Sequence, residues 1–188
     1  LVFSRASPRF VTAERALRVV ERLPPGVLKV GVFLDQSVEV IRAVERDVPL
    51  DLIQLHGREG PEACRELGVE RVVKAVVLRG EESVRGAAEW PAAYLLADRP
   101  RPGSSEPAPP PAAETADWTL AARLAKSHPR TLLAGGLTPD NAAAAVRGVR
   151  PWGVDVSSGV EASPGVKDPE AMKAFFEAVR RADAEAAG

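Results

Sequence analysis

The segment from Thr131 to Asp168 constrains the fold of this 188-residue chain more than any other. It contains two short, largely apolar runs, at 132–134 and 154–156, and each run leads into a loop of glycine or serine residues. A helix is predicted to start at Thr138 after the first loop, and another at Asp168 after the second. Backbone N–H groups in such loops approach an anion closely, and a helix N-terminus adds favourable partial charge. The segment therefore predicts a phosphate site.

Five small residues form the two predicted phosphate loops. They are Gly135, Gly136, Ser157, Ser158 and Gly159. Glycines also end strands before ordinary turns, so each loop alone has a purely structural explanation. Two such loops on successive strands, however, resemble the phosphate site of a β/α barrel, which follows the seventh and eighth strands. The pairing of the loops favours phosphate binding.

Strand-like and helix-like segments alternate along the whole chain. Near-continuous apolar runs, typical of strands covered on both faces, occupy residues 1–3, 28–34, 51–55, 71–78, 92–97, 131–134 and 153–156. Their starts mostly lie about twenty residues apart, which leaves room for one crossover helix. The length of the chain and its 45% hydrophobic content predict a single α/β domain over residues 1–188.

Start signals mark the helices between these runs. They are Thr12, Ser37, the pair Gly60-Pro61 and the pair Asp168-Pro169. In the last helix Met172, Phe175, Phe176 and Val179 repeat with helical spacing, which predicts that this stripe packs into the core.

The count of units points to a barrel that is one unit short. Seven strand-like runs are each followed by a helix-like segment, whereas a closed (β/α)8 TIM barrel has eight. The sequence opens directly on the apolar run Leu1-Val2-Phe3, so we expect the first β/α unit to be absent from it. The proline-rich stretch Arg99–Glu114 is predicted to be either a mobile active-site loop or a solvated insertion.

Composition narrows the classes of partner. The net charge of −1 and the absence of a basic patch with aromatic residues give no case for nucleic acid. One cysteine and two histidines make a poor metal set. No apolar run approaches the ~20 residues of a membrane span, and no signal peptide is recognisable. We expect a cytoplasmic protein, as a monomer or homodimer, that uses neither metal nor cofactor.

Five motifs occur in the order of one known family. They are LVFSRASPRFVT at residue 1, VGVF at Val30, DLIQLHG at Asp51, LLAGGLTPDN at Leu132 and GVDVSSGVEASPGVKD at Gly153. The chain thereby resembles phosphoribosylanthranilate isomerase of tryptophan biosynthesis. The resemblance implies an Amadori rearrangement of a small phosphoribosyl substrate, N-(5'-phosphoribosyl)anthranilate, to 1-(2-carboxyphenylamino)-1-deoxyribulose 5-phosphate. Such a reaction needs one acid and one base, without metal or cofactor.

The resemblance assigns the acid to Asp117, in Ala116-Asp117-Trp118, where the family has FDW. A carboxylic acid holds its proton near neutral pH when burial raises its pKa, and Trp118 would help by packing there. The alternative is a plain helix N-cap. Arg9, in SPR, is assigned to the anthranilate carboxylate, which a guanidinium grips through two hydrogen bonds; the alternative is a solvated loop arginine.

Three further side chains are candidates for substrate binding. Gln54 and His56 end the fourth barrel strand, where barrel active sites are built, although a structural histidine is the alternative for His56. Asp155 interrupts an apolar strand, and alternation sends it inward, where a carboxylate is costly unless it has a partner. It either holds the site together or touches the substrate.

The catalytic base is where this sequence departs from the family. The family's base is the cysteine of a KICG strand, and neither that strand nor its helix is present here. Cys64 lies in PEACREL, an outer-layer helix, and is predicted to be a small buried hydrophobe. Two alternatives therefore remain: a truncated barrel that only binds phosphosugars, and a related phosphosugar isomerase of the histidine pathway, against which the SPR and QLHG segments argue.

Overall fold

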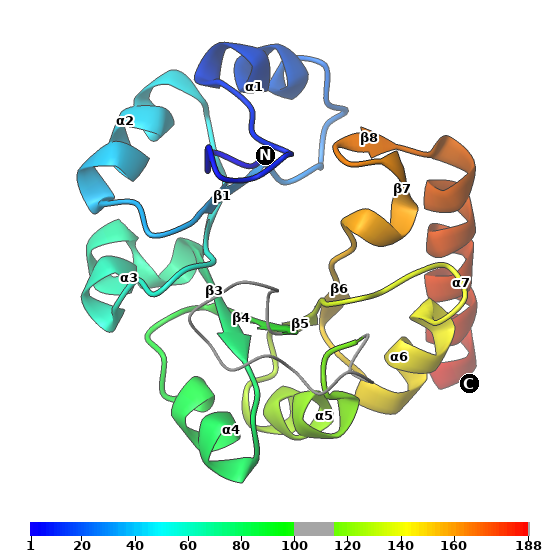
Figure 1. The fold of residues 1–188 in the computed structure, drawn as a ribbon. Helices are drawn as coiled ribbons and strands as arrows, with labels where there is room; N and C mark the ends of the chain where they lie inside the picture. Colours follow the sequence, from blue (N-terminus) through cyan, green and yellow to red (C-terminus); the bar gives the residue numbers. More distant parts are fainter. Residues whose placement is uncertain (100–114, 188) are drawn as a thin grey trace. The chain divides into compact units, whose positions relative to one another are not determined.

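The structure, a computed structural model, describes residues 1–99 and 115–187 of an α/β protein. The helices are α1 (Ala13–Val20), α2 (Val38–Asp47), α3 (Pro61–Leu67), α4 (Glu81–Ala88), α5 (Trp118–Ser127), α6 (Ala142–Val149) and α7 (Pro169–Ala187). The parallel strands are β1 (Val30–Phe33), β2 (Leu52–Leu55), β3 (Val72–Val77), β4 (Tyr94–Asp98), β5 (Thr131–Leu133) and β6 (Gly153–Val154) (Figure 1). The pairs β1–β2, β2–β3, β4–β5 and β5–β6 each join strands that are consecutive in the chain, as β/α units require.

The chain divides into two compact units. One comprises Leu1–Ala75 with Trp90–Tyr94, and the other comprises Val76–Glu89 with Leu95–Gly188. The prediction of a single domain over the whole chain stays a prediction.

The first unit contains the parallel pairs β1–β2 and β2–β3. The first apolar run forms no full strand; Val2 makes isolated parallel bridges to Val32 and Phe10. Phe3 and Phe33 stack with ring centroids 5.3 Å apart, and both are buried. In this unit α1 contacts α2, and α2 contacts α3.

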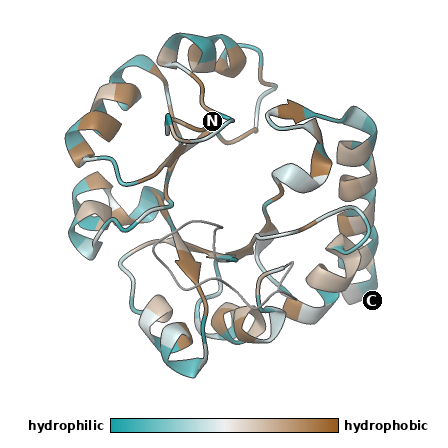
Figure 2. Ribbon diagram, viewed as in Figure 1, coloured by the Kyte–Doolittle hydropathy of each residue, from teal (hydrophilic) through white to brown (hydrophobic). Residues whose placement is uncertain are grey.

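The second unit contains the parallel pairs β4–β5 and β5–β6. Its helices contact one another in sequence order from α4 to α7, and they carry hydrophobic and hydrophilic residues along the same helix (Figure 2). Leu95 and Leu96 of β4 and Leu133 of β5 are fully buried. Strands with both faces covered explain the near-continuous apolar runs of the sequence.

Most predicted helix starts are confirmed, and each has a local cause. The hydroxyl of Thr12 accepts the N–H of Arg15 at the start of α1, and Pro61 begins α3 at a position where its missing N–H costs nothing. Asp168 Oδ1 accepts the N–H groups of Glu170 and Ala171 at the start of α7. Ser37 precedes α2 without a side-chain capping bond.

The predicted start at Thr138 is wrong by four residues. Helix α6 begins at Ala142 with Asn141 in the capping position, and Thr138 lies in the turn before it. Asn141 Oδ1 accepts the N–H of Thr138, which stabilises this turn.

The predicted core stripe of α7 is wrong in part. Phe175 is 4% exposed, but Phe176 is 59% exposed and Met172 is 37% exposed. The buried face of the helix runs instead through Phe175, Ala178 and Ala182. Helical spacing identified residues on one side of α7, but the side covered by neighbours is rotated relative to that stripe.

A small antiparallel hairpin was not predicted. It pairs β7 (Glu161–Ser163) with β8 (Val166–Lys167), directly after the short helix η2 (Ser158–Val160). Its turn is Pro164-Gly165, and Gly165 has a φ of 83°, in the left-handed region that favours glycine. The Pro-Gly dipeptide was the available signal.

The proline-rich stretch Arg99–Glu114 falls, apart from Arg99, outside the described residues. Among the helices of the described part, none is long and apolar enough to cross a membrane.

Candidate active site

Gln54 and His56 come together at the end of β2 in the first unit. Gln54 is 8% exposed, and its side-chain amide nitrogen lies 2.7 Å from Nδ1 of His56. An amide nitrogen only donates, so Nδ1 accepts this bond. With the Gln54 amide in this orientation, a neutral His56 ring carries its proton on Nε2, and its Nε2–H can donate a hydrogen bond; the roles of the two ring nitrogens depend on that tautomer.

The loop after His56 is held by two residues that sequence reasoning missed. Glu59 follows His56 by three residues, and Lys74 lies in β3. Their side chains form a buried ion pair at 2.9 Å. The signal in the sequence was a lysine in the middle of the apolar run RVVKAVV, because a lysine is seldom buried without a partner.

Arg9 lies in a compact loop between the Val2 bridge and α1. Its backbone N–H donates to the hydroxyl of Ser7, and the N–H of Phe10 donates to the Ser7 carbonyl. Arg9 is half-buried. The loop therefore presents Arg9 from an ordered turn, and its assignment to a carboxylate stays a prediction.

The first predicted phosphate loop follows β5 in the second unit. Gly135 and Gly136 have φ values of 78° and 72°, in the left-handed region that favours glycine. A β-carbon on Gly135 would lie 2.7 Å from the backbone nitrogen of Arg99 and 2.8 Å from Oδ1 of Asp98. Asn141 Nδ2 donates to the Gly136 carbonyl. The loop is tightly held between β4 and the start of α6.

The second predicted phosphate loop follows β6 and touches the first. A β-carbon on Gly159 would overlap the carbonyl oxygen of Leu137. Lys167 Nζ donates to the carbonyl of Ser157 at 2.7 Å and to Glu161 Oε1 at 3.1 Å. The two small-residue loops therefore lie against each other, with an ammonium group bound to one of them. Phosphate binding by these loops stays a prediction.

Asp117 begins α5 as its N-cap. Its Oδ1 accepts the N–H groups of Thr119 at 3.0 Å and Leu120 at 3.1 Å. The preceding residue, Ala116, donates its N–H to the carbonyl of Gly135, so Asp117 is adjacent in the chain to a residue bound to the first phosphate loop. The capping alternative is confirmed, whereas the expected burial is wrong because Asp117 is exposed. The acid role stays a prediction.

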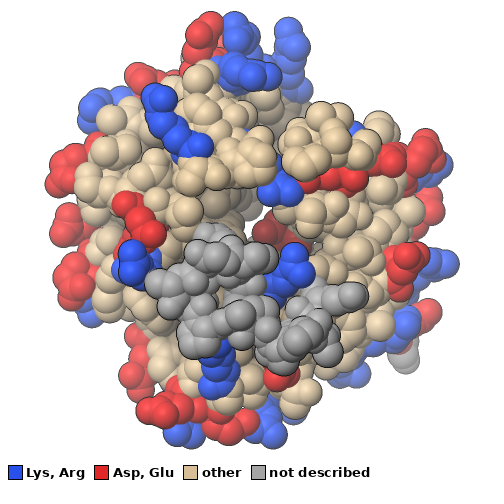
Figure 3. All heavy atoms as spheres, viewed as in Figure 1, with Lys and Arg blue, Asp and Glu red and all other residues tan. Residues whose placement is uncertain are grey.

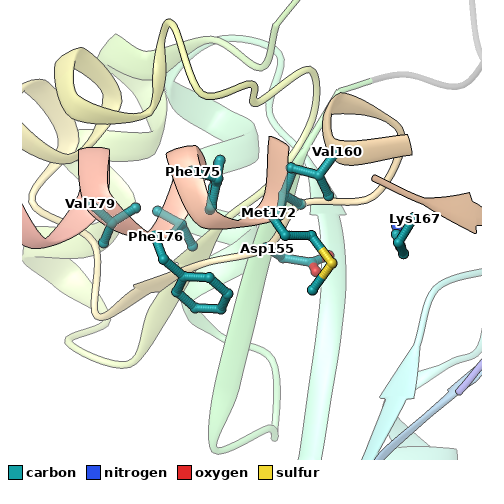
Figure 4. Close-up of a pocket in the computed structure, with 9 residues that line it drawn as sticks. Asp155, Val160, Lys167, Met172, Phe175, Phe176 and Val179 are labelled. Carbon is teal, nitrogen blue, oxygen red and sulfur yellow. The ribbon is translucent and has the colours of Figure 1, made fainter. Parts of the chain in front are cut away.

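Asp155 is also exposed, and it lies outside the strand that it was expected to interrupt. Strand β6 ends at Val154, and Asp155 starts the loop beyond it. It lines a pocket of about 300 Å³ together with Lys167 and the α7 residues Met172 and Phe176 (Figure 4). Its role in binding or support stays a prediction.

Cys64 is buried in α3 with no exposed surface. Burial raises the pKa of its thiol, which disfavours the thiolate. Its interpretation as a small buried hydrophobe is confirmed. No group of three or more histidine, cysteine or acidic side chains able to hold a metal ion occurs among the residues that the structure describes. On the face shown in Figure 3, acidic and basic side chains are interspersed over the surface.

Comparison with known proteins relates the chain to one family. The family model described as N-(5'-phosphoribosyl)anthranilate (PRA) isomerase matches residues 1–178. A curated protein of Pelobacter propionicus named N-(5'-phosphoribosyl)anthranilate isomerase is 40% identical over 185 residues, which cover 98% of this chain and 85% of that protein.

Solved structures give the same result. A phosphoribosylanthranilate isomerase in complex with reduced 1-(o-carboxyphenylamino)-1-deoxyribulose 5-phosphate has a TM-score of 0.81 and 35% identity, over 96% of this chain and 86% of that one. Monomers generated from the dimeric enzyme of Thermotoga maritima have a TM-score of 0.81 and 35% identity, over 96% of this chain and 85% of that one.

Proposed function

The chain belongs to the N-(5'-phosphoribosyl)anthranilate isomerase family, and on that basis we propose how it catalyses the family's reaction. The reaction converts N-(5'-phosphoribosyl)anthranilate into 1-(2-carboxyphenylamino)-1-deoxyribulose 5-phosphate, a step of L-tryptophan biosynthesis. The structural observation that carries the proposal is the contact between the loop of Gly135 and Gly136 and the loop of Ser157, Ser158 and Gly159.

The two loops bind the substrate phosphate. Left-handed glycines turn backbone N–H groups toward one point, and phosphate oxygens accept hydrogen bonds from such groups. Gly135 and Gly136 have this conformation, and Gly159 allows the second loop to approach the first. Lys167, which is bound to the Ser157 carbonyl, adds a positive charge next to the second loop.

Asp117 acts as the general acid. It protonates the ribose ring oxygen, so that the ring opens to a Schiff base, and a base then removes the C2' proton to form the enolamine. Asp117 is exposed and capped onto α5, so the bound substrate itself has to shield the carboxyl from water during this step. We assign no residue of the chain as the base, because Cys64 is buried in α3.

The aromatic end of the substrate carries a carboxylate. Arg9 binds this group through its guanidinium, since a planar fork of donors matches two carboxylate oxygens. The Nε2–H of His56 donates to a substrate oxygen, and the Gln54 amide maintains this tautomer. Asp155, exposed at the end of β6, binds a substrate hydroxyl or orders the second loop.

The proposal extends to the barrel architecture, the oligomeric state and the location of the protein. The chain order of the parallel strands and the TM-scores to solved relatives support a (β/α)8 barrel. The related enzyme from Thermotoga maritima is described as dimeric, so both monomer and homodimer remain candidates for this protein. A cytoplasmic location stays a prediction.

The deciding experiment is isomerase activity of the purified chain, followed by the loss of phosphoribosylanthranilate fluorescence, with the mass of the chain verified. Turnover supports the proposal and requires a base other than the family's cysteine. A second sample carries the family's cysteine-bearing strand and helix in front of Leu1. Turnover in that sample alone assigns the base to the added cysteine, and phosphate-analogue binding without turnover in either sample contradicts the proposed reaction.

A further inference from the structure

A buried carboxylate and a buried ammonium lie behind the loop that carries His56. The side chains of Glu59 and Lys74 are only 3% and 4% exposed, and Lys74 Nζ lies 2.9 Å from Glu59 Oε2. The ammonium also lies 5.2 Å from the ring centroid of Trp90, within the range of a cation–π contact. All three residues belong to the first compact unit.

The pair holds both backbone groups of the residue after His56. Glu59 Oε2 accepts the N–H of Gly57 at 2.8 Å, and Lys74 Nζ donates to the Gly57 carbonyl at 2.6 Å. With its N–H and its carbonyl both bonded to buried charged groups, Gly57 has little freedom to move. Charge-assisted bonds of this kind are stronger than neutral ones.

The same carboxylate extends to the loop that follows β1. Glu59 Oε1 accepts the N–H of Asp35 at 2.7 Å, and Asp35 Oδ1 accepts the N–H of Arg58 at 2.6 Å. Asp35 has a φ of 55°, a left-handed conformation that is uncommon outside glycine. A β-carbon on Gly57 would lie 2.5 Å from Asp35 Oδ1, so the two loops are packed at the limit of close approach.

We propose that the Glu59–Lys74 ion pair positions His56 for its contact with the substrate, by fixing the backbone of Gly57. A buried ion pair often stabilises the fold no more than apolar residues of the same volume would. What this pair adds is the fixed position of the backbone groups that it binds. His56 is linked to it through Gly57 on one side and contacts the Gln54 amide on the other. The proposal rests on the proposed function only for the statement that His56 contacts the substrate.

The experiment reads the tautomer of His56 directly. The chain has two histidines, so histidine labelled with ¹⁵N gives two rings, and the Nδ1 and Nε2 shifts report where each proton sits. In the wild type we expect His56 to carry its proton on Nε2. His128, at the C-terminal end of α5, serves as the internal reference.

Three variants test the positioning role. Lys74→Met alone leaves the Glu59 charge buried without its partner and is expected to be poorly folded. The pair Glu59→Gln with Lys74→Met removes both charges, and Glu59→Asp keeps the charge but shortens the reach to Asp35 and Gly57. In both of these we expect a measurable fraction of the Nδ1–H tautomer at His56.

Lys29→Met is the matched control. Lys29 forms an ion pair of the same length, 2.9 Å, with Asp51 at the other end of the strands. We expect this variant to have the wild-type tautomer of His56 and the wild-type kcat/KM. In Glu59→Asp and in the double variant we expect kcat/KM to fall about 10-fold to 100-fold, because misplacement of a substrate-contacting group by about 1 Å is enough for such a loss.

The outcomes separate this proposal from the proposed function. A wild-type tautomer of His56 in folded Glu59→Asp and in the folded double variant overturns the positioning role. A shifted tautomer with unchanged kcat/KM overturns it as well, because His56 would then not depend on the pair for its function. A wild-type chain without any turnover contradicts the proposed function, while the tautomer measurement still decides whether the pair holds His56.

Discussion

Gly159 packs directly against the carbonyl oxygen of Leu137, and a β-carbon on Gly159 would overlap that oxygen. The contact joins the loop after β6 to the loop after β5. Two segments that are separated by a whole helix, α6, thereby form one backbone surface of glycine and serine residues. This contact requires a residue without a β-carbon at position 159, which only glycine provides.

Replacement of Gly159 by alanine is therefore expected to separate the two loops. We predict that Gly159→Ala raises KM by about tenfold or more, because a displacement near 1 Å is enough for such a loss, with a smaller effect on kcat. Steady-state kinetics of the isomerase reaction measure both constants.

The matched control is Gly86→Ala in α4, where a β-carbon would meet nothing within 4 Å. Alanine in a helix is favoured over glycine by about 0.5–1 kcal/mol, so this variant is expected to raise the free energy of unfolding with unchanged kinetics. Equal KM values for Gly159→Ala and wild type would show that the contact between the loops is not needed for substrate binding.

The capping role of Asp117 can be separated from its proposed role as the acid by one substitution. Asparagine is as good an N-cap as aspartate, so Asp117→Asn is expected to retain the bonds to Thr119 and Leu120 and the stability of α5. It has no acidic proton to give to the ribose oxygen. We predict loss of turnover, with binding of a phosphorylated product analogue largely intact, as measured by stopped assays and calorimetry.

Asp168→Asn is the control for this variant. Asp168 caps α7 in the same way, through Oδ1 and two backbone N–H groups. Asp168→Asn removes the charge of a helix cap but leaves the proposed acid in place. We expect the activity to stay within about twofold of wild type, because replacing aspartate by asparagine at an N-cap has little effect on helix stability. Unchanged turnover in Asp117→Asn would exclude Asp117 as the acid.

Arg9 tests the assignment of the substrate carboxylate. A charge-assisted hydrogen bond contributes about 1.5–3 kcal/mol. Loss of the guanidinium that binds the substrate carboxylate should weaken binding by that amount, which corresponds to roughly a 10-fold to 100-fold increase in KM. We predict this increase for Arg9→Ala. The control is Arg5→Ala in the same loop, since Arg5 lies 5.5 Å from the centroid of the Phe10 ring and is exposed. Similar kinetic constants for Arg9→Ala and Arg5→Ala would remove Arg9 from the site.

Much of the fold was predictable because its causes are local. The apolar runs predicted β1 to β6 because parallel strands are covered on both faces, and Thr12 and Asp168 make capping bonds to residues two or three positions away. The exposure of Phe176 was not predictable in this way. Spacing shows which residues share a face of a helix, but the neighbours that cover the face come from elsewhere in the chain.

For the candidate site, too, the features with local causes were predictable and those that depend on distant residues were not. Small-residue loops identified the two segments that meet at Gly159, because glycine and serine have a local signature. For the pair Glu59–Lys74 only the lysine stands out, in its apolar run. Nothing local identifies Glu59 as its partner, because the two residues lie 15 residues apart and meet through a turn and a strand. The exposure of Asp117 and Asp155 also depends on where β6 and α5 begin and end, and the boundaries of elements are the part of a sequence prediction that fails most easily.

A charge at the start of β2 is expected to make the stability of the protein depend on pH. Asp51 Oδ2 accepts the backbone N–H of Lys29 at 2.7 Å, and it pairs with the Lys29 ammonium at 2.9 Å. These bonds to the Lys29 backbone and side chain hold the pKa of Asp51 below its ordinary value of 3.8. Because the pKa is lower in the folded chain than in the unfolded chain, the carboxylate stabilises the fold above about pH 4, and this contribution is lost as the pH falls through the folded-state value.

Asp51→Asn isolates this contribution. The amide oxygen of asparagine still accepts the Lys29 N–H, so the variant loses the charge alone. We predict that it lowers the free energy of unfolding by about 0.5 kcal/mol at pH 7, a typical value for a partly exposed ion pair, and that the difference from wild type is smaller at pH 3 than at pH 7. Urea unfolding at a series of pH values measures it. Glu14→Gln, which breaks a far more exposed pair with Arg18, should show almost no difference at either pH. A difference for Asp51→Asn that is the same at pH 3 and pH 7 would mean that the carboxylate charge is not what stabilises this end of β2.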